Sequence, residues 1–85
     1  MKNTLLLADD EEGIRKVLGI ALADAGYDVQ TAENGMEALQ RFRETRPSIV
    51  LTDIKMPGMD GIEVLRRIKR IDPLAAVIII TAYGS

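Results

Sequence analysis

The chain has 85 residues with no cysteine and no histidine, and its 11 basic and 13 acidic residues give a net charge of −2. This composition excludes disulfide frameworks, zinc ribbons, thiol nucleophiles and histidine-based catalysis, and it offers no basic surface for nucleic acid. A hydrophobic content of 47% favours one small folded domain over disorder.

Short apolar runs alternate with longer segments of helical spacing along the chain. In chain order we predict a strand over 4–8, a helix over 11–25, a strand over 27–31, a helix over 35–45, a strand over 48–52, a helix over 61–71 and a strand over 76–80. Strands that alternate with helices predict an α/β fold, in which helices cover both faces of a parallel sheet.

Each predicted helix has one apolar face that we expect to pack on the sheet. These faces comprise Ile14, Val17, Leu18, Ala21, Leu22 and Ala25 in the first helix, Ala38, Leu39 and Phe42 in the second, and Ile62, Leu65 and Ile68 in the third, with Val64 as a further candidate. Gly26, Pro47 and Pro73 follow the three helices and are typical of helix ends.

The last predicted strand is the most apolar, and a parallel strand of this kind is normally buried on both faces. Only five residues follow it, so no helix returns to cover it. We therefore expect the front part of a domain whose exposed fourth strand drives homo-oligomer formation. The longest apolar run, 75–80, is far shorter than the ~20 residues of a membrane helix. No signal peptide is recognisable, which favours the cytoplasm.

Acidic residues follow two of the predicted strands. Asp9 and Asp10 come after the first strand, and Asp53 comes after the third. Ligands of open parallel sheets bind beyond the carboxyl ends of the strands, and these carboxylates converge if the two strands are neighbours. Three clustered carboxylates repel one another and favour a hard cation, Mg²⁺ before Ca²⁺.

A carboxylate beside such an ion can attack phosphorus and form an acyl phosphate. Thr81 follows the fourth strand, where its hydroxyl could donate to a phosphoryl oxygen. The acids also have structural interpretations: residues 9–12 could cap the first helix, and Asp60 is expected to cap the third. Asp53 is poorly placed for capping, because the third helix starts well downstream.

Three segments resemble the receiver domain of bacterial two-component response regulators. They are Leu-Leu-Leu-Ala-Asp-Asp-Glu over 5–11, Thr-Asp-Ile-Lys-Met-Pro-Gly-Met-Asp-Gly over 52–61 and Ile-Thr-Ala over 80–82. The resemblance covers the whole chain, residues 1–85. It implies a flavodoxin-like (CheY-like) fold with strand order 2-1-3-4, lacking the family's fifth strand and last helices. The closing Thr-Ala-Tyr-Gly-Ser is most similar to NtrC-type receivers.

The resemblance also implies roles for individual residues. Asp53 matches the phosphoacceptor, and Asp10, Asp53 and the backbone carbonyl of Lys55 match the Mg²⁺ ligands. Asp9 matches the acid that acts on the ion through water, and Thr81 matches the switch hydroxyl. The implied partners are a sensor histidine kinase as phosphodonor and a downstream output domain absent from this chain, with no direct nucleic-acid or membrane contact.

One departure from the family pattern is large. Receivers carry a lysine at the end of a fifth strand, and this chain has lysine at positions 2, 16, 55 and 69 only. Two alternatives to a phosphoacceptor therefore stand beside it. One is a truncated, non-signalling fragment that self-associates through its fourth strand. The other is a phosphohydrolase of the haloacid-dehalogenase type, which is disfavoured because Lys55 stands where such enzymes commonly place a second acid.

Overall fold

The sheet has four parallel strands in the order β2-β1-β3-β4, which confirms the predicted α/β class and strand order. The computed structural model describes residues 3–80. Its elements are β1 (Thr4–Ala8), α1 (Glu12–Asp24), β2 (Asp28–Ala32), α2 (Gly35–Thr45), β3 (Ile49–Asp53), α3 (Gly61–Ile71) and β4 (Ala76–Ile80). The predicted boundaries differ from these by no more than one residue.

Strand β1 occupies the centre of the sheet. It pairs with β2 on one side, with Thr4 opposite Asp28, and with β3 on the other, with Leu5 opposite Ile49. Leu5, Leu6 and Leu7 are all at most 2% exposed. A continuous apolar run of this kind is what a strand covered on both faces requires.

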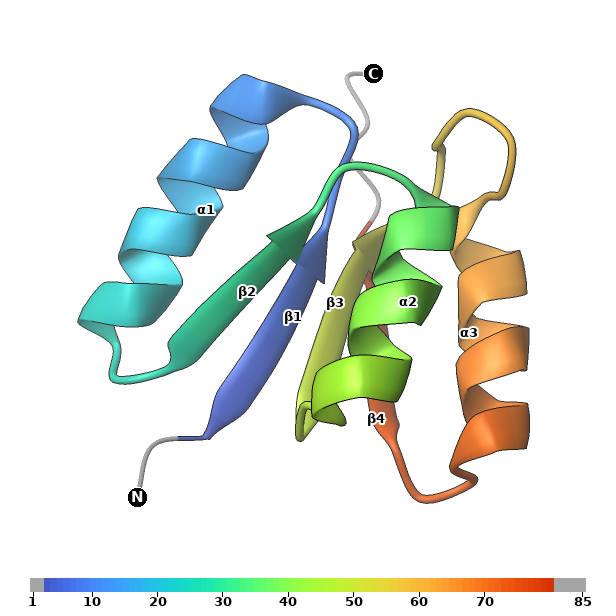
Figure 1. Cartoon of the computed structure of the whole chain (residues 1–85). Coiled ribbons are helices and arrows are strands. Elements are labelled where there is room, and N and C mark those ends of the chain that lie inside the picture. Colours follow the sequence, from blue (N-terminus) through green and yellow to red (C-terminus); the bar gives the residue numbers. More distant parts are fainter. Residues whose placement is uncertain (1–2, 81–85) are drawn as a thin grey trace.

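Helices α2 and α3 lie side by side on one face of the sheet, and α1 lies on the other (Figure 1). We term these the packed face and the open face. On the packed face, alternate strand residues such as Leu6, Ala8 and Val50 join the core cluster with both helices. The largest helix residues in that cluster are Leu39, Phe42, Val64 and Ile68.

The open face is covered much less completely. No residue of α1 is fully buried, and Val17 and Ile20 are 67% and 71% exposed. The expectation that Val17 packs on the sheet was therefore wrong. Among the apolar residues expected to face the sheet, Ile14, Leu18 and Leu22 are half-buried, whereas Val17, Ala21 and Ala25 are exposed. Helix α1 is therefore rotated away from the predicted orientation.

A similar correction applies to α3. Ile62 was expected on the apolar face but is 38% exposed, whereas Val64 and Ile68 are completely buried. The ends of the helices follow the expectation. Gly26 has a φ of 103° after α1, and Arg46 closes α2 with a φ of 47° before Pro47.

Strand β4 lies at an edge of the sheet among the described residues. Its side chains are at most half-buried, and Ile78 on the open face is 52% exposed. This agrees with the expectation of an apolar strand without a cover. Within residues 3–80, none of the helices has the length and apolarity needed to cross a membrane.

Candidate functional site

Three carboxylates meet at the carboxyl end of the sheet. Asp9 and Asp10 directly follow β1, and Asp53 is the last residue of β3. Because β1 and β3 are neighbours, one oxygen from each of the three lies within 4.8 Å of the others. Asp9 and Asp53 are 3% and 6% exposed, while Asp10 faces solvent. The predicted convergence of the three acids is confirmed.

The surroundings of Asp9 disfavour its charged form. Its pKa is raised above the ordinary value of 3.8, first because burial disfavours the charged form and then because Asp53 and Asp10 repel it. Two contacts oppose the rise: the amide of Glu11 donates to Asp9 Oδ1 at 2.9 Å, and the positive charge of Arg15 lies nearby. The pocket therefore holds repulsion that a bound cation would relieve.

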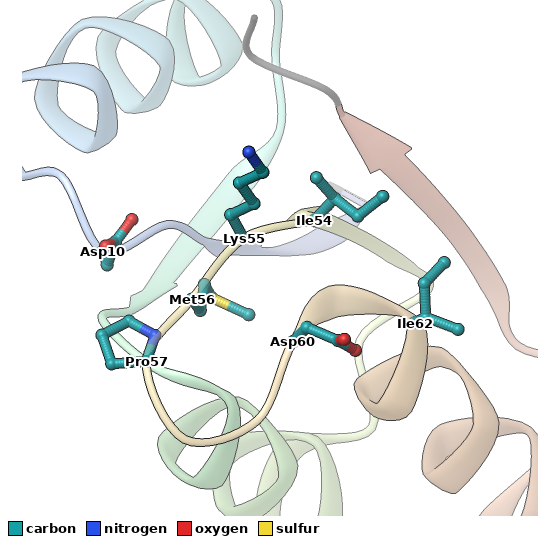
Figure 2. A pocket seen from close by; sticks show the side chains of 7 residues that line it. All are labelled: Asp10, Ile54, Lys55, Met56, Pro57, Asp60 and Ile62. Carbon is teal, nitrogen blue, oxygen red and sulfur yellow. The ribbon is translucent and has the colours of Figure 1, made fainter.

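An open hollow of about 610 Å³ lies beside the carboxylates. It is lined by Asp10, Ile54, Lys55, Met56, Pro57, Asp60 and Ile62 (Figure 2). Figure 2 shows Asp10 and Ile54 on opposite sides of the exposed Lys55 side chain. The acidic cluster thus opens to solvent on the Asp10 side, where a small anionic group could approach.

The β3–α3 loop, residues 54–60, carries Lys55 and is held at several points. The amide of Gly61 donates to the carbonyl of Ile54, and that of Met59 donates to Pro57, both at 2.9 Å. Gly58 has a φ of 82°, a conformation that favours glycine. These contacts fix the path of the loop directly after the buried Asp53.

Both helices of the packed face begin with a side-chain cap, and of the two only the Asp60 cap was predicted. Asp60 caps α3 by accepting from the amide of Glu63, and Asn34 caps α2 by accepting from the amide of Glu37. By contrast, Glu11 at the start of α1 makes no side-chain capping hydrogen bond. The interpretation of residues 9–12 as acids that begin the first helix holds in part, because Glu12 lies in the first turn of α1 and Asp9 accepts from the amide of Glu11. The buried Asp9 also forms part of the acidic cluster.

Sequence reasoning did not identify Arg15 as part of this region. Its Nη1 donates to the backbone carbonyl of Asp9 at 2.8 Å, and its Nη2 lies 4.0 Å from Glu33 Oε2. The Arg15 side chain is only 16% exposed. In the sequence it looks like an ordinary solvated charge on α1, and no spacing rule would have singled it out. Thr81, the predicted switch hydroxyl, lies outside the described residues.

The side chains of the cluster suit one class of ion. They offer carboxylate oxygens, and the chain has no cysteine or histidine to supply a sulfur or an imidazole nitrogen. Oxygen-only ligation by a few carboxylates with open positions for water suits Mg²⁺. The acidic cluster is thus consistent with a magnesium site.

The sequence matches a known family model over nearly its whole length. The model, described as the response regulator receiver domain, matches residues 5–85. Among curated proteins, the chain is 48% identical over 84 residues to sporulation initiation phosphotransferase F of Bacillus subtilis. It is 47% identical over 78 residues to the DNA-binding transcriptional regulator NtrC of Escherichia coli.

The lengths of these relatives differ from that of the chain. The match covers 99% of this chain and 68% of the sporulation protein, but only 17% of NtrC. Among solved structures, the response regulator TrrA from Thermotoga maritima, described as a complex with Mg²⁺-BeF, superimposes with a TM-score of 0.93 at 43% identity. That match covers 99% of this chain and 72% of TrrA.

Proposed function

We propose that this chain, which belongs to the response regulator receiver domain family, accepts a phosphoryl group on Asp53. Receiver domains of two-component systems receive phosphoryl groups from histidine kinases, and response regulators are phosphoacceptors rather than enzymes. The observation that carries the proposal is the meeting of Asp9, Asp10 and Asp53 at the carboxyl ends of β1 and β3. An isolated helix cap or surface acid would not be built in this way.

In the proposed reaction an oxygen of the Asp53 carboxylate attacks the phosphorus of a phosphohistidine on the kinase. A P–O bond forms, the P–N bond breaks, and its electron pair leaves on the imidazole nitrogen, which then takes a proton from water. The product on Asp53 is an acyl phosphate. The attack needs no protein base, because a carboxylate nucleophile has no proton to lose.

We further propose that Asp10, Asp53 and the backbone carbonyl of Lys55 are ligands of Mg²⁺, with Asp9 acting through water. The carboxylate-only donor set supports this assignment. When bound, Mg²⁺ supplies positive charge that offsets the charge of the phosphoryl group. Asp9 and Asp53 are both buried. The pKa of Asp9 is raised first by burial and then by repulsion from Asp53 and Asp10, which a cation would offset.

The readout of phosphorylation is the finer part of the proposal. Thr81 directly follows β4 in the sequence, where its hydroxyl would meet the phosphoryl group and bias the end of that strand. We propose that this change acts on an output domain or partner outside this chain. We also propose a cytoplasmic location for this chain, because the histidine kinase makes its phosphohistidine from ATP.

A second proposal concerns the extent of the domain. The chain spans 68% of the sporulation protein and 67–72% of several solved receivers, and we propose that residues 1–85 are the first four-strand part of a receiver. Two observations support self-association through β4: it is an edge strand of the described sheet, and Ile78 is half-exposed on its open face. Multi-angle light scattering should then give a mass above 9.3 kDa; a compact monomer at moderate concentration would contradict this second proposal.

Intact mass after incubation with acetyl phosphate and Mg²⁺ tests the phosphoacceptor. We expect the mass to rise by one phosphoryl group in the native chain, but not in Asp53→Asn or without Mg²⁺. Asp60→Asn is the matched control, because Asp60 is an acid of the neighbouring loop that caps α3. It should leave the gain intact.

If the 85 residues gain no mass, the same assay is repeated on a chain extended by a fifth strand and helix. A gain in the extended chain only would support the self-associating structural fragment. No gain in either chain would overturn the phosphoacceptor assignment. Turnover of a small phosphate ester by the native chain would instead favour the phosphohydrolase.

A further inference from the structure

Two glycines begin the helices of the packed face, and both lie against the β3–α3 loop. Gly61 is the first residue of α3, and a Cβ there would overlap the carbonyl oxygen of Asp53. Gly35 is the first residue of α2, and a Cβ there would lie 2.8 Å from Met59 Cβ and 2.9 Å from the Met59 carbonyl oxygen. Gly61 directly follows the loop in the sequence, whereas Gly35 lies in a different part of the chain and contacts the loop through space.

The need for glycine at position 35 is one of space. Positive φ angles occur at Gly26 and Gly58, but not at Gly35. Other residues could therefore adopt its backbone conformation, and asparagine at position 34 already supplies the helix cap. A methyl group at position 35 would be closer to Met59 than real Cβ contacts allow. It would also lie 3.0 Å from Val64 Cγ2, in the core.

Met59 has little freedom to move away. Its side chain is 9% exposed, and its amide donates to Pro57 at 2.9 Å. The loop is closed at its base by the hydrogen bond from Gly61 to Ile54. If Met59 moves, the residues between Ile54 and Met59 therefore have to move with it. These residues include Lys55 and Met56.

We infer that Gly35 is a positioning residue for the acidic site. It lets α2 approach closely enough to seat Met59, and thereby sets the position of the β3–α3 loop and of the Lys55 carbonyl. This inference rests on the proposed function only where it names Lys55 as a Mg²⁺ ligand. The placement of the loop itself is independent of any ion.

The test compares Gly35→Ala with Gly19→Ala in metal-free protein by NMR. Gly19 is a helical glycine with nothing within 4 Å of an added Cβ, so the same chemical change meets open space there. We expect Gly35→Ala to shift the backbone amide signals of Lys55 and Met56, and Gly19→Ala to leave them in place. Equal shifts in the two variants, or no shift in a folded Gly35→Ala, would overturn the inference.

Mg²⁺ titration followed by calorimetry gives the second readout. We expect Gly35→Ala to raise the Kd for Mg²⁺ by roughly tenfold, as is common when a residue that supports a ligand is changed, and Gly19→Ala to leave it unchanged. A merely structural role would lower the melting temperature of Gly35→Ala without changing the Kd of the folded protein, which would overturn the inference.

Met59→Gly removes the side-chain atom that lies nearest to an added Cβ at position 35. This second variant keeps the inference testable if Gly35→Ala alone does not fold. We expect Gly35→Ala to cost less thermal stability in the Met59→Gly background than in the native chain, because the two sites are in contact. Additive effects would overturn the inference. Failure of the native chain to bind Mg²⁺ would overturn the proposed metal site instead, while the amide shifts would still decide the role of Gly35.

Discussion

The two faces of the sheet differ in how tightly they are covered. On the packed face, Phe42 and Ile68 are at most 1% exposed among two helices that contact each other. On the open face, α1 contributes no fully buried residue, and Ile78 of β4 is 52% exposed. Most of the apolar burial that stabilises the described part of the chain therefore lies on the packed face.

Asp53, the proposed phosphoacceptor, belongs to the open face. Side chains alternate along β3, so Asp53 shares the face of Ile49 and Leu51, whereas Val50 and Thr52 share the packed face. The chain thus places its buried charge at the end of the less tightly packed face. Side-chain packing on the packed face can then hold β3 in position although the carboxylates at its end repel one another.

The largest expected effect would come from breaking the packed face. Phe42→Ala should lower the free energy of unfolding by about 3–5 kcal/mol, because it leaves a cavity among α2, α3 and the sheet. Urea denaturation monitored by circular dichroism measures this. Ile20→Ala on the open face should stay within about 0.5 kcal/mol of the native chain. Similar losses for the two variants would contradict the contrast between the faces.

The next effect concerns the charge at the end of the open face. Asp53→Asn should stabilise the metal-free chain by on the order of 1 kcal/mol, because it removes a charge that repels Asp9. Thermal unfolding in EDTA measures the gain. Added Mg²⁺ should then raise the melting temperature of the native chain much more than that of the variant. A variant less stable than the native chain in EDTA would speak against repulsion in the pocket.

Gly19→Ala sharpens the comparison by strengthening the open face. An added methyl group at position 19 meets nothing within 4 Å, and alanine is the better helix former in α1. We expect the free energy of unfolding to rise by about 0.5–1 kcal/mol. Urea midpoints of the variant and the native chain test this. A loss of stability would show that α1 is packed more closely than its burial indicates.

The smallest effect is a dependence on pH. The pKa of Asp9 is raised in the folded chain above 3.8, so the folded state holds its proton more strongly than the unfolded state. Stability linked to this group is present at low pH and is lost as the pH rises through the raised pKa. In EDTA, the stability of Asp9→Asn relative to the native chain should therefore increase as the pH rises above 3.8. A constant difference over this range would contradict the raised pKa.

Much of this arrangement could be predicted from the sequence, and the failures have physical reasons. Alternating strand and helix patterns predicted every element, and the acids after two neighbouring strands predicted the cluster. Val17 and Ile62 were misplaced because apolar spacing defines a strip on a helix but not how the helix rotates against its sheet. Arg15 and Gly35 were missed because their roles depend on contacts with Asp9 and Met59, which apolar spacing and helix-capping patterns do not encode.

The central position of β1 bears on the order of events during synthesis. Of the four described strands, β1 comes first in the sequence, and it must wait for both β2 and β3 before its two edges are paired. Asp10 and Asp53 lie far apart along the chain and meet only when that pairing is complete. A nascent chain therefore has no formed acidic cluster until β1 has paired with β3.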